Sequence, residues 1–389
     1  MKHRILPLIL CFLLLMCTFA AACGSSSDDT DETTTVSSDS EGGDATADSD
    51  SENTTDNSDI TTDDISGENA TNDSSSGISD ETGNSTDDDS NATSATVRIG
   101  ALKGPTTMGI SPMIVSEPAV TSSNSYEATM VTAADELMTL VLQEEVDIAL
   151  LPANVAATLY NKTDGEITVI DINTLGVLYV VTGDDSVTSL EDLAGRTIYL
   201  TGKGTTPDYA LQYVLSQAGI LDEVTLEYKS ESSEVAALLA SDSTLIGLLP
   251  QPYVTVALAN NEDLSIALSL DEEWTNVSTD GSRLVTGVTI VRNSFLEEYP
   301  DAVAQFLTDH AACAALAAED PDQIAEYVVE LGIIEKEAVA KKAVPYCSIS
   351  YYDGEEMKEM LSGYLQVLYD LNTSAVGGSM PGDDFYYIP

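Results

Sequence analysis

Short apolar stretches alternate with segments of helical periodicity along the chain from residue 97 onward. Residues 97–102 and 147–151 are strand-length apolar runs, whereas residues 133–144 carry apolar side chains at helical spacing. Continuous apolar runs of this length are typical of strands in a parallel sheet that is buried on both faces. We therefore predict alternating strands and helices over residues 97–151.

The same rhythm returns later in the chain. Strand-like and helix-like segments alternate again at residues 198–200, 208–218, 224–228, 234–240 and 245–249. Two successive strand–helix–strand units of similar design predict two α/β lobes.

Two long β-prone runs, residues 175–181 and 284–291, flank the second unit, and the chain after them is helical. We expect lobe one to comprise about residues 96–180 and 284–389, with lobe two, about residues 181–283, inserted. The two runs would then be crossing strands at a hinge, which lets two lobes close on a ligand. The predicted fold class is α/β, with two lobes that each contain a mostly parallel sheet flanked by helices.

The first residues predict export from a bacterial cell. Lys2 and Arg4 precede an apolar run at residues 5–19, which is short for a membrane span and fits the core of a signal peptide. We expect the signal peptide to occupy residues 1–22.

The residues that follow this run suggest a lipid anchor. Small residues lead up to Cys23, and this arrangement resembles the lipobox of bacterial lipoproteins, with Ala20 where that motif usually has leucine. We expect lipidation of Cys23 and an extracytoplasmic protein that is lipid-anchored to the cell membrane. The alternative is ordinary cleavage near Ala22, which leaves Cys23 as a free thiol.

Residues 24–95 have a different composition from the rest. They hold 21 of the 66 acidic residues, and they contain no Lys, Arg or aromatic residue. Such a segment buries too little apolar surface to offset the entropy of ordering it. We predict that residues 23–95, beginning with the lipidated cysteine, form a disordered acidic tether.

The remainder, from residue 96 onward, is also acidic, with 45 acidic residues against 12 basic ones. Binding to nucleic acid needs clustered Lys and Arg, so we expect no nucleic-acid partner. The same charge disfavours docking on anionic lipid, and the membrane is expected to be reached through the N-terminal lipid alone.

Candidate catalytic residues are sparse. The only histidine beyond the signal segment is His310, which lies in an alanine-rich helical segment where a surface or packing role is expected. No His/Cys set has metal-ligand spacing, and no nucleophile elbow or nucleotide-binding loop is present. We therefore predict that the protein is not an enzyme and needs no metal and no cofactor.

Two cysteines remain in the folded region. Cys313 and Cys347 are an even pair in an exported chain, so a disulfide between them is a possible bridge. The alternative for Cys313 is a small buried hydrophobic residue in its helix.

The folded region resembles the type II periplasmic binding proteins, in particular the group that serves nitrate, sulfonate, bicarbonate or thiamine-precursor import by ABC transporters. The motifs that carry this resemblance are ALKGPTTMG at 101–109, LPAN at 151–154, NTLGV at 173–177, TGKGTTP at 201–207, LPQP at 249–252, LSGY at 361–364 and GGSMPGDDFYY at 377–387. The resemblance covers essentially all of residues 97–389. It implies the two-lobed fold and capture of a small solute.

A repeated loop is the main candidate for solute binding. It follows the first strand of each lobe, where ligands bind in open α/β sheets and where free N–H groups at a helix start favour an anion. Its residues are Lys103, Gly104, Thr106 and Thr107 in lobe one, and Lys203, Gly204, Thr205 and Thr206 in lobe two. We expect the two loops to form opposite jaws of one cleft, although Gly, Thr and Pro are also ordinary loop residues.

Other candidates follow strand ends. Asn154 either caps the next helix or offers its amide to the ligand. Asn173 and Thr174 precede the first crossing strand and are expected at the cleft floor. Gln251 is a candidate hydrogen-bond donor and Tyr253 a stacking partner, against the simpler interpretation of a surface Gln beside a Pro-started helix.

Two further side chains are considered for the cleft. Trp274 is the only tryptophan, and packing under a loop is expected of it rather than a place at the cleft rim. Arg283 is the one further cation near the second crossing.

The predicted function is solute capture between closing lobes and delivery to the permease and ATPase subunits of an ABC importer, by a monomer. Candidate solutes are a sulfonate, nitrate, bicarbonate or a thiamine-precursor-like heterocycle. The alternative is a surface lipoprotein that senses a solute or adheres without transporting it.

Overall fold

The computed structural model describes residues 95–115 and 122–389. The predicted signal peptide, the lipidated Cys23 and most of the acidic tether lie outside the described residues. In the described part of the chain, no helix has both the length and the apolar character needed to cross a bilayer.

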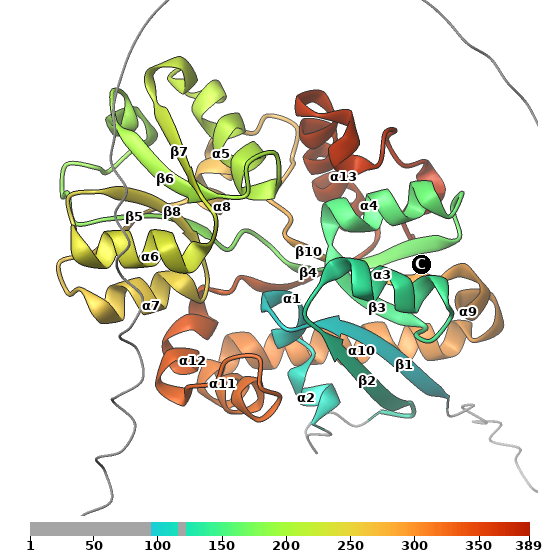
Figure 1. Ribbon diagram of the computed structural model, residues 1–389. Coiled ribbons are helices and arrows are strands. Elements are labelled where there is room, and N and C mark those ends of the chain that lie inside the picture. Colours follow the sequence, from blue (N-terminus) through green and yellow to red (C-terminus); the bar gives the residue numbers. More distant parts are fainter. Residues whose placement is uncertain (1–94, 116–121) are drawn as a thin grey trace, which may run out of the picture. The chain divides into compact units, whose positions relative to one another are not determined.

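The first sheet has six strands in the order β11-β4-β10-β3-β1-β2 (Figure 1). Strands β2 and β3 are parallel to β1, whereas β10 is antiparallel to both of its neighbours and β11 is antiparallel to β4. The strands are β1 (Thr96–Leu102), β2 (Ser125–Val131), β3 (Ile148–Pro152), β4 (Ile167–Thr174), β10 (Gly287–Arg292) and β11 (Ile349–Tyr352).

The second sheet has five strands in the order β7-β6-β8-β5-β9. Strands β7 and β8 are parallel to β6, and β5 is antiparallel to β8 and β9. The strands are β5 (Leu178–Thr182), β6 (Thr197–Thr201), β7 (Thr225–Lys229), β8 (Ile246–Pro250) and β9 (Ser265–Ser269).

The two sheets repeat one plan. In each, a parallel set of three strands is extended by an antiparallel strand that enters from the other lobe, β10 in the first sheet and β5 in the second. The chain arrives from the opposite lobe and therefore runs against its neighbours, so both sheets are mixed. The predicted α/β class with two lobes is confirmed, whereas the sheets are mixed and not mostly parallel, and the chain crosses between them in segments that are not strands.

The helices cover both faces of each sheet. In the first lobe, the apolar side chains of β1 face α10, while alternate residues of β3 face α3 and α4; in the second, α5 and α8 cover one face and α6 and α7 the other. The helices are α1 (Pro105–Met108), α2 (Ser111–Ile114), α3 (Ala134–Leu142), α4 (Ala153–Lys162), α5 (Thr206–Gln217), α6 (Ser232–Ser241), α7 (Tyr253–Asn260), α8 (Leu270–Val277), α9 (Asn293–Glu298), α10 (Pro300–Glu319), α11 (Pro321–Glu330), α12 (Glu337–Ala343) and α13 (Gly354–Leu371).

The chain changes sheets close to the expected positions. The first crossing is the short segment 175–177, so β5 lies wholly in the second sheet, whereas the sequence prediction assigned its first half to lobe one. The second crossing is the segment 278–286 between α8 and β10.

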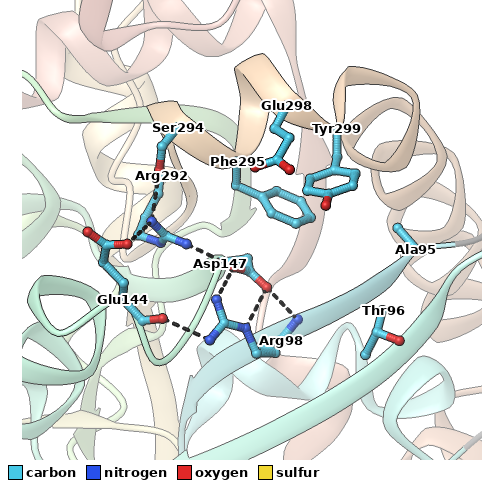
Figure 2. Close-up of a pocket in the computed structure, with 10 residues that line it drawn as sticks. All are labelled: Ala95, Thr96, Arg98, Glu144, Asp147, Arg292, Ser294, Phe295, Glu298 and Tyr299. Carbon is cyan, nitrogen blue, oxygen red and sulfur yellow. Dashed lines mark hydrogen bonds and ion pairs between the residues drawn. The ribbon is translucent and has the colours of Figure 1, made fainter. Parts of the chain in front are cut away.

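A buried carboxylate ties three strands of the first sheet at their ends remote from the second lobe. Asp147, immediately before β3, accepts hydrogen bonds from the backbone and side chain of Arg98 in β1 and from Arg292 Nη2 at the end of β10, the last at 3.0 Å. Figure 2 shows Asp147 between the two guanidinium groups, beside a cavity of about 520 Å³. Both cations of this cavity are therefore neutralised within the protein.

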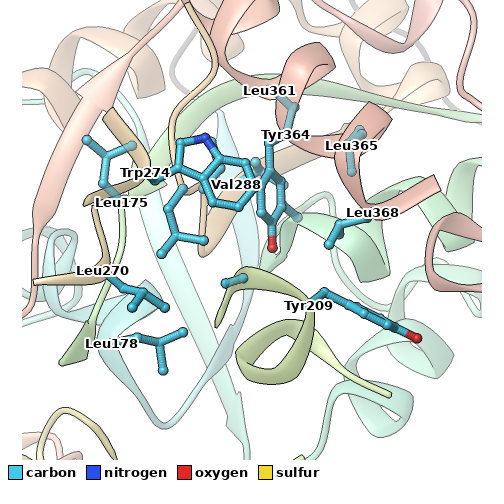
Figure 3. Close-up of a cluster of buried hydrophobic side chains, with 14 of the residues drawn as sticks. Leu175, Leu178, Tyr209, Leu270, Trp274, Val288, Leu361, Tyr364, Leu365 and Leu368 are labelled. Atoms are coloured by element: carbon cyan, nitrogen blue, oxygen red, sulfur yellow. The ribbon is translucent and has the colours of Figure 1, made fainter. Parts of the chain in front are cut away.

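The two lobes share one hydrophobic cluster. Trp274 of α8 is fully buried, and its ring centroid lies 4.1 Å from that of Tyr213 in α5 and 5.5 Å from that of Tyr364 in α13. Figure 3 shows Trp274 against Tyr364 and the leucines of α13, with Leu270 and Leu178 of the second lobe nearby. Trp274 thus joins the lobes and is not a rim residue.

The possible disulfide is not formed. Cys313 and Cys347 are both free and buried, and they lie in different hydrophobic clusters. Burial raises the pKa of each thiol to about 12, which keeps both protonated. Of the two alternatives for Cys313, the structure has the small buried hydrophobic residue and not the bridge, because an even cysteine count carries no information on how far apart two side chains lie.

The Asp147 network predicts a pH dependence. Burial raises the pKa of Asp147, but the hydrogen bonds from Arg98 and Arg292 outweigh this and give a net lowering. The carboxylate therefore stabilises the fold above its unfolded pKa of about 3.9, and this contribution is lost as the pH falls through the lower folded value. Asp147→Asn should be destabilised at pH 7, and its difference from the wild type should shrink toward pH 3, as measured by urea unfolding. Asp185→Asn, at an exposed carboxylate, is the control, and an equal effect in both variants would contradict the assignment.

The Trp274 cluster predicts a large loss of stability. Trp274→Ala should lower the free energy of unfolding by about 3–5 kcal/mol, because it leaves a cavity between the lobes. Leu142→Ala, at a half-exposed side chain, should cost about 1 kcal/mol or less. Chemical denaturation of both variants measures this, and a Trp274→Ala loss as small as that of the control would refute the shared cluster.

Candidate functional site

The floor between the lobes is polar on the side of the first sheet. Asn173 of β4 is buried; its Nδ2 donates to Thr289 Oγ1 of β10 at 3.2 Å, and its Oδ1 accepts from the Thr174 hydroxyl at 2.9 Å. The hydroxyl of Thr106 in α1 is buried and has no partner among the described residues. The structure therefore brings together three predicted residues, Thr106, Asn173 and Thr174.

Gly287, at the start of β10, makes this arrangement possible. A Cβ there would lie 2.4 Å from Asn173 Oδ1 and 2.5 Å from Thr106 Cγ2. The sequence reasoning did not single out Gly287, because only the fold shows that three segments converge on it.

The other residues of the first loop present fewer free hydrogen-bonding groups to a ligand than Thr106 does. The Thr107 hydroxyl donates to the Leu102 carbonyl at 2.5 Å, so it is used within the loop. Lys103 is exposed, and its backbone N–H donates to Val131 at 2.9 Å. Gly104 has an extended backbone, and a Cβ there would meet open space.

The second loop is closed by a carboxylate of the protein itself. Asp208, in the first turn of α5, accepts from the Gly204 N–H at 2.7 Å and from the Tyr228 hydroxyl at 2.7 Å. The Lys203 ammonium lies 5.2 Å from the centre of the Tyr228 ring, and Thr205 bonds the Gly202 carbonyl. An acidic side chain in the first turn satisfies the helix N-terminus. The expectation of a free anion-binding N–H at Gly204 is therefore wrong.

Thr206, the first residue of α5, faces the other lobe. Its side chain is hydrogen-bonded to the hydroxyl of Tyr364 in α13, whose pKa is raised by burial. Asn372 strengthens the same contact, because its Nδ2 donates to the Tyr209 hydroxyl at 2.7 Å. Thr206 thus serves lobe packing in this arrangement.

Two remaining candidates lie at helix starts. Asn154 is the second residue of α4, whose N-cap is Pro152, so the capping alternative is wrong and ligand contact stays a prediction. Tyr253 is the first residue of α7 and is 37% exposed, which leaves its ring free to stack on a solute.

Gln251 lines a cavity of about 420 Å³ between the lobes. The side chain is 3% exposed, and its Oε1 accepts from the Thr255 hydroxyl at 2.9 Å. This bond fixes the orientation of the amide, and Nε2 has no partner in the described part of the chain. A buried amide group with unused N–H donors is costly unless an acceptor reaches it.

The walls of this cavity come from both lobes. The second lobe contributes Val254 and Leu258 of α7 and Ile266 of β9, and the first contributes Lys341 and Lys342 of α12 together with Pro345 and Tyr346. Sequence reasoning missed the α12 lysines. The sequence does show Lys341 and Lys342 as an adjacent pair of cations in a strongly acidic domain, but no sequence pattern indicates that α12 packs beside α7.

Contacts around the crossings hold the lobes in register. Arg283 Nη2 donates to Asp271 Oδ2 of α8 at 2.7 Å; burial raises the pKa of Asp271, and Arg283 opposes this. On the first crossing, Leu175 N donates to the Ser348 carbonyl at 3.1 Å, and the Ser348 hydroxyl donates to the Gly176 carbonyl at 2.6 Å. Arg283 is therefore engaged in the hinge.

The single histidine of the domain is structural. His310 is fully buried in α10, and its Nδ1 lies 3.0 Å from Asp171 Oδ2 of β4. Across the described ranges, no group of three or more His, Cys, Asp or Glu side chains is arranged to hold a metal ion.

The convergence at Gly287 predicts a position that is sensitive to substitution. Gly287→Ser should lower the free energy of unfolding by about 1–3 kcal/mol, because its Cβ would collide with Asn173 and Thr106. Gly104→Ser, which adds the same side chain in open space, should change stability by about 0.5 kcal/mol or less. Urea unfolding of the two variants compares them, and equal stability would show that the floor is loosely packed.

Comparisons with known proteins agree with this architecture. A family model described as "ABC transporter, phosphonate, periplasmic substrate-binding protein" matches residues 121–264. An ABC transporter structure from Parabacteroides distasonis is 25% identical, with a TM-score of 0.64 over 76% of this chain and 98% of its own. Comparison with curated proteins gives no sequence match.

Two more distant structures share the fold. The periplasmic aliphatic sulphonate binding protein SsuA from Escherichia coli is 12% identical, with a TM-score of 0.58 over 76% of this chain and 92% of its own. The ligand binding component of an ABC-type import system from Staphylococcus aureus, solved with zinc bound, is 13% identical, with a TM-score of 0.53 over 76% and 97%. The chain therefore has the two-lobed fold of the type II periplasmic binding proteins of ABC transporters, which bind solutes and are not enzymes.

Proposed function

We propose that the protein captures a small anionic solute, similar to a phosphonate or sulfonate, and delivers it to an ABC importer. The family match names phosphonate, and one structural relative is named for aliphatic sulphonate. In this proposal the domain is held at the outer face of the membrane by a lipid on Cys23, with residues 24–95 as its tether.

The observation that carries the proposal is the cavity of about 420 Å³ between two lobes whose sheets repeat one plan, with the unpaired Gln251 amide in its wall. Its volume is in the range of small-molecule sites. An anion is an acceptor only, and it therefore suits both the free N–H donors of Gln251 and the lysines of α12.

The two sides of the contact between the lobes suggest how capture works. On one side, the buried rings of Trp274 and Tyr364 pack with their centroids 5.5 Å apart, and on the other side α7 and α12 border the cavity. We infer that the lobes pivot about the aromatic side and part at α7 and α12. A solute that touches both lobes then favours the closed state by its differential affinity.

The polar floor supplies the remaining proposed contacts. Thr106 has an unused hydroxyl, and Asn173 and Thr174 lie beside it at the end of β4. Asn154 and Tyr253 are retained as proposed contacts from the neighbouring helix starts. The closed protein would dock on the permease as a monomer, and the ATPase would supply the energy of transport.

The test is a thermal-shift series on the purified protein with phosphonates, sulfonates, nitrate and carboxylates. A solute that binds the folded state alone raises the melting temperature, and at 100 times its Kd it stabilises by about 2.7 kcal/mol. We expect at least one anion to do so and Gln251→Ala to weaken its effect, since the amide donors are lost. Neutral sugars of similar size serve as the control. Stabilisation by neutral solutes alone, or by none of the solutes, would refute the proposal.

A further inference from the structure

The two lysines that line the cavity at Gln251 differ in whether they form ion pairs. Lys341 Nζ lies 2.9 Å from Glu337 Oε1 and 3.5 Å from Glu326 Oε1, so it is already neutralised. Lys342, the next residue, makes no ion pair within the described ranges. The cavity therefore offers an acid group one unpaired positive charge.

The neutral donors of the cavity are oriented as well. Thr255 holds Gln251 Oε1 at 2.9 Å, and this contact directs the NH2 group of the amide away from Thr255. The Nε2 atom is buried and unpaired, and Gln251 and Lys342 line the same cavity from opposite lobes. One cation and one amide are together suited to a group with a single negative charge.

The rest of the second-lobe wall is apolar. Val254 and Leu258 of α7 and Ile266 of β9 present hydrocarbon to the cavity. A solute that is only an acid group would leave this apolar surface in contact with water, whereas a solute with a hydrocarbon chain would bury it, and each buried CH₂ group would strengthen binding.

We propose, resting on the function proposed above, that the solute is an amphiphilic monoanion, such as a short-chain sulfonate or carboxylate, whose acid group is bound by Lys342 and Gln251. Its hydrocarbon part lies against α7 and β9. An alkylphosphonate, unlike a sulfonate or a carboxylate, has a second acidic proton, and in mildly alkaline solution it loses this proton and carries a second negative charge. With one free cation, the cavity leaves the second charge unpaired and favours the monoanion.

The experiment is calorimetric titration of the protein at pH 9, where hexylphosphonate is mostly the dianion and lysine is still protonated, with hexanesulfonate, hexanoate, hexylphosphonate and methanesulfonate. We expect hexanesulfonate or hexanoate to bind at least tenfold more tightly than hexylphosphonate and methanesulfonate. Lys342→Gln should weaken the preferred ligand roughly tenfold, the equivalent of one charge-assisted contact. Lys336→Gln, at an exposed cation that precedes the same helix, should leave its affinity unchanged. Thr255→Val should also weaken binding, because the amide is no longer oriented.

The outcomes separate this inference from the proposed function. Equal or tighter binding of hexylphosphonate, or equal effects of Lys342→Gln and Lys336→Gln, would overturn the inference while leaving solute capture intact. An absence of binding by every anion in both this titration and the thermal-shift series would overturn both.

Discussion

The two crossings between the sheets, which are the passages of the chain at residues 175–177 and 278–286, are the constraint on which the rest of the structure depends. Gly176 lies on the first passage, and a Cβ there would be 2.7 Å from Asp271 Cβ and 2.9 Å from Leu284 Cδ2 of the second. The passages therefore run in contact, with Asp271 between them and Arg283 paired to it. Because both strands that enter from the opposite lobe, β5 and β10, start from this point, the registers of both sheets depend on it.

The C-terminal segment reinforces this point. Ser348 bonds the first passage through its carbonyl and its hydroxyl, and the Tyr346 carbonyl accepts from the Tyr179 hydroxyl of β5 at 2.8 Å. Burial raises the pKa of Tyr179 to about 12, so this hydroxyl remains a donor at physiological pH. Residues near 348 thus act as a third link between the lobes, although the sequence prediction had two. Since Tyr346 also lines the cavity, the link and the proposed solute contact the same short segment.

The alternation of strands and helices could be predicted from the sequence, because a strand that is buried on both faces is a nearly continuous apolar run. The runs at residues 97–102 and 245–249 correspond to β1 and β8 within a residue or two, and the late part of the chain, which was expected to be helical, contains α9 to α13 together with the short strand β11. The polar floor was also predictable in part, since Asn173 and Thr174 directly precede the first crossing. The sequence could not show which polar groups are already hydrogen-bonded within the protein. Asp208 closes the second loop by a side-chain orientation that no pattern records, and the two cysteines are separated by packing.

The α12 side of the cavity illustrates a more general limit of sequence reasoning. Gln251 and Lys342 are far apart in the chain, and each is ordinary in its local context: a glutamine after a strand, and a lysine near the end of a helix. They line one cavity only because the second crossing returns the chain to the first lobe. The late helix α12 of the first lobe then packs beside α7 of the second lobe. Lys342 is an unpaired cation among the described residues of a strongly acidic domain, and it lies where the two lobes meet. An anionic solute is therefore attracted to this junction. Binding there necessarily couples charge recognition to closure, since neither lobe alone supplies both the amide and the ammonium group.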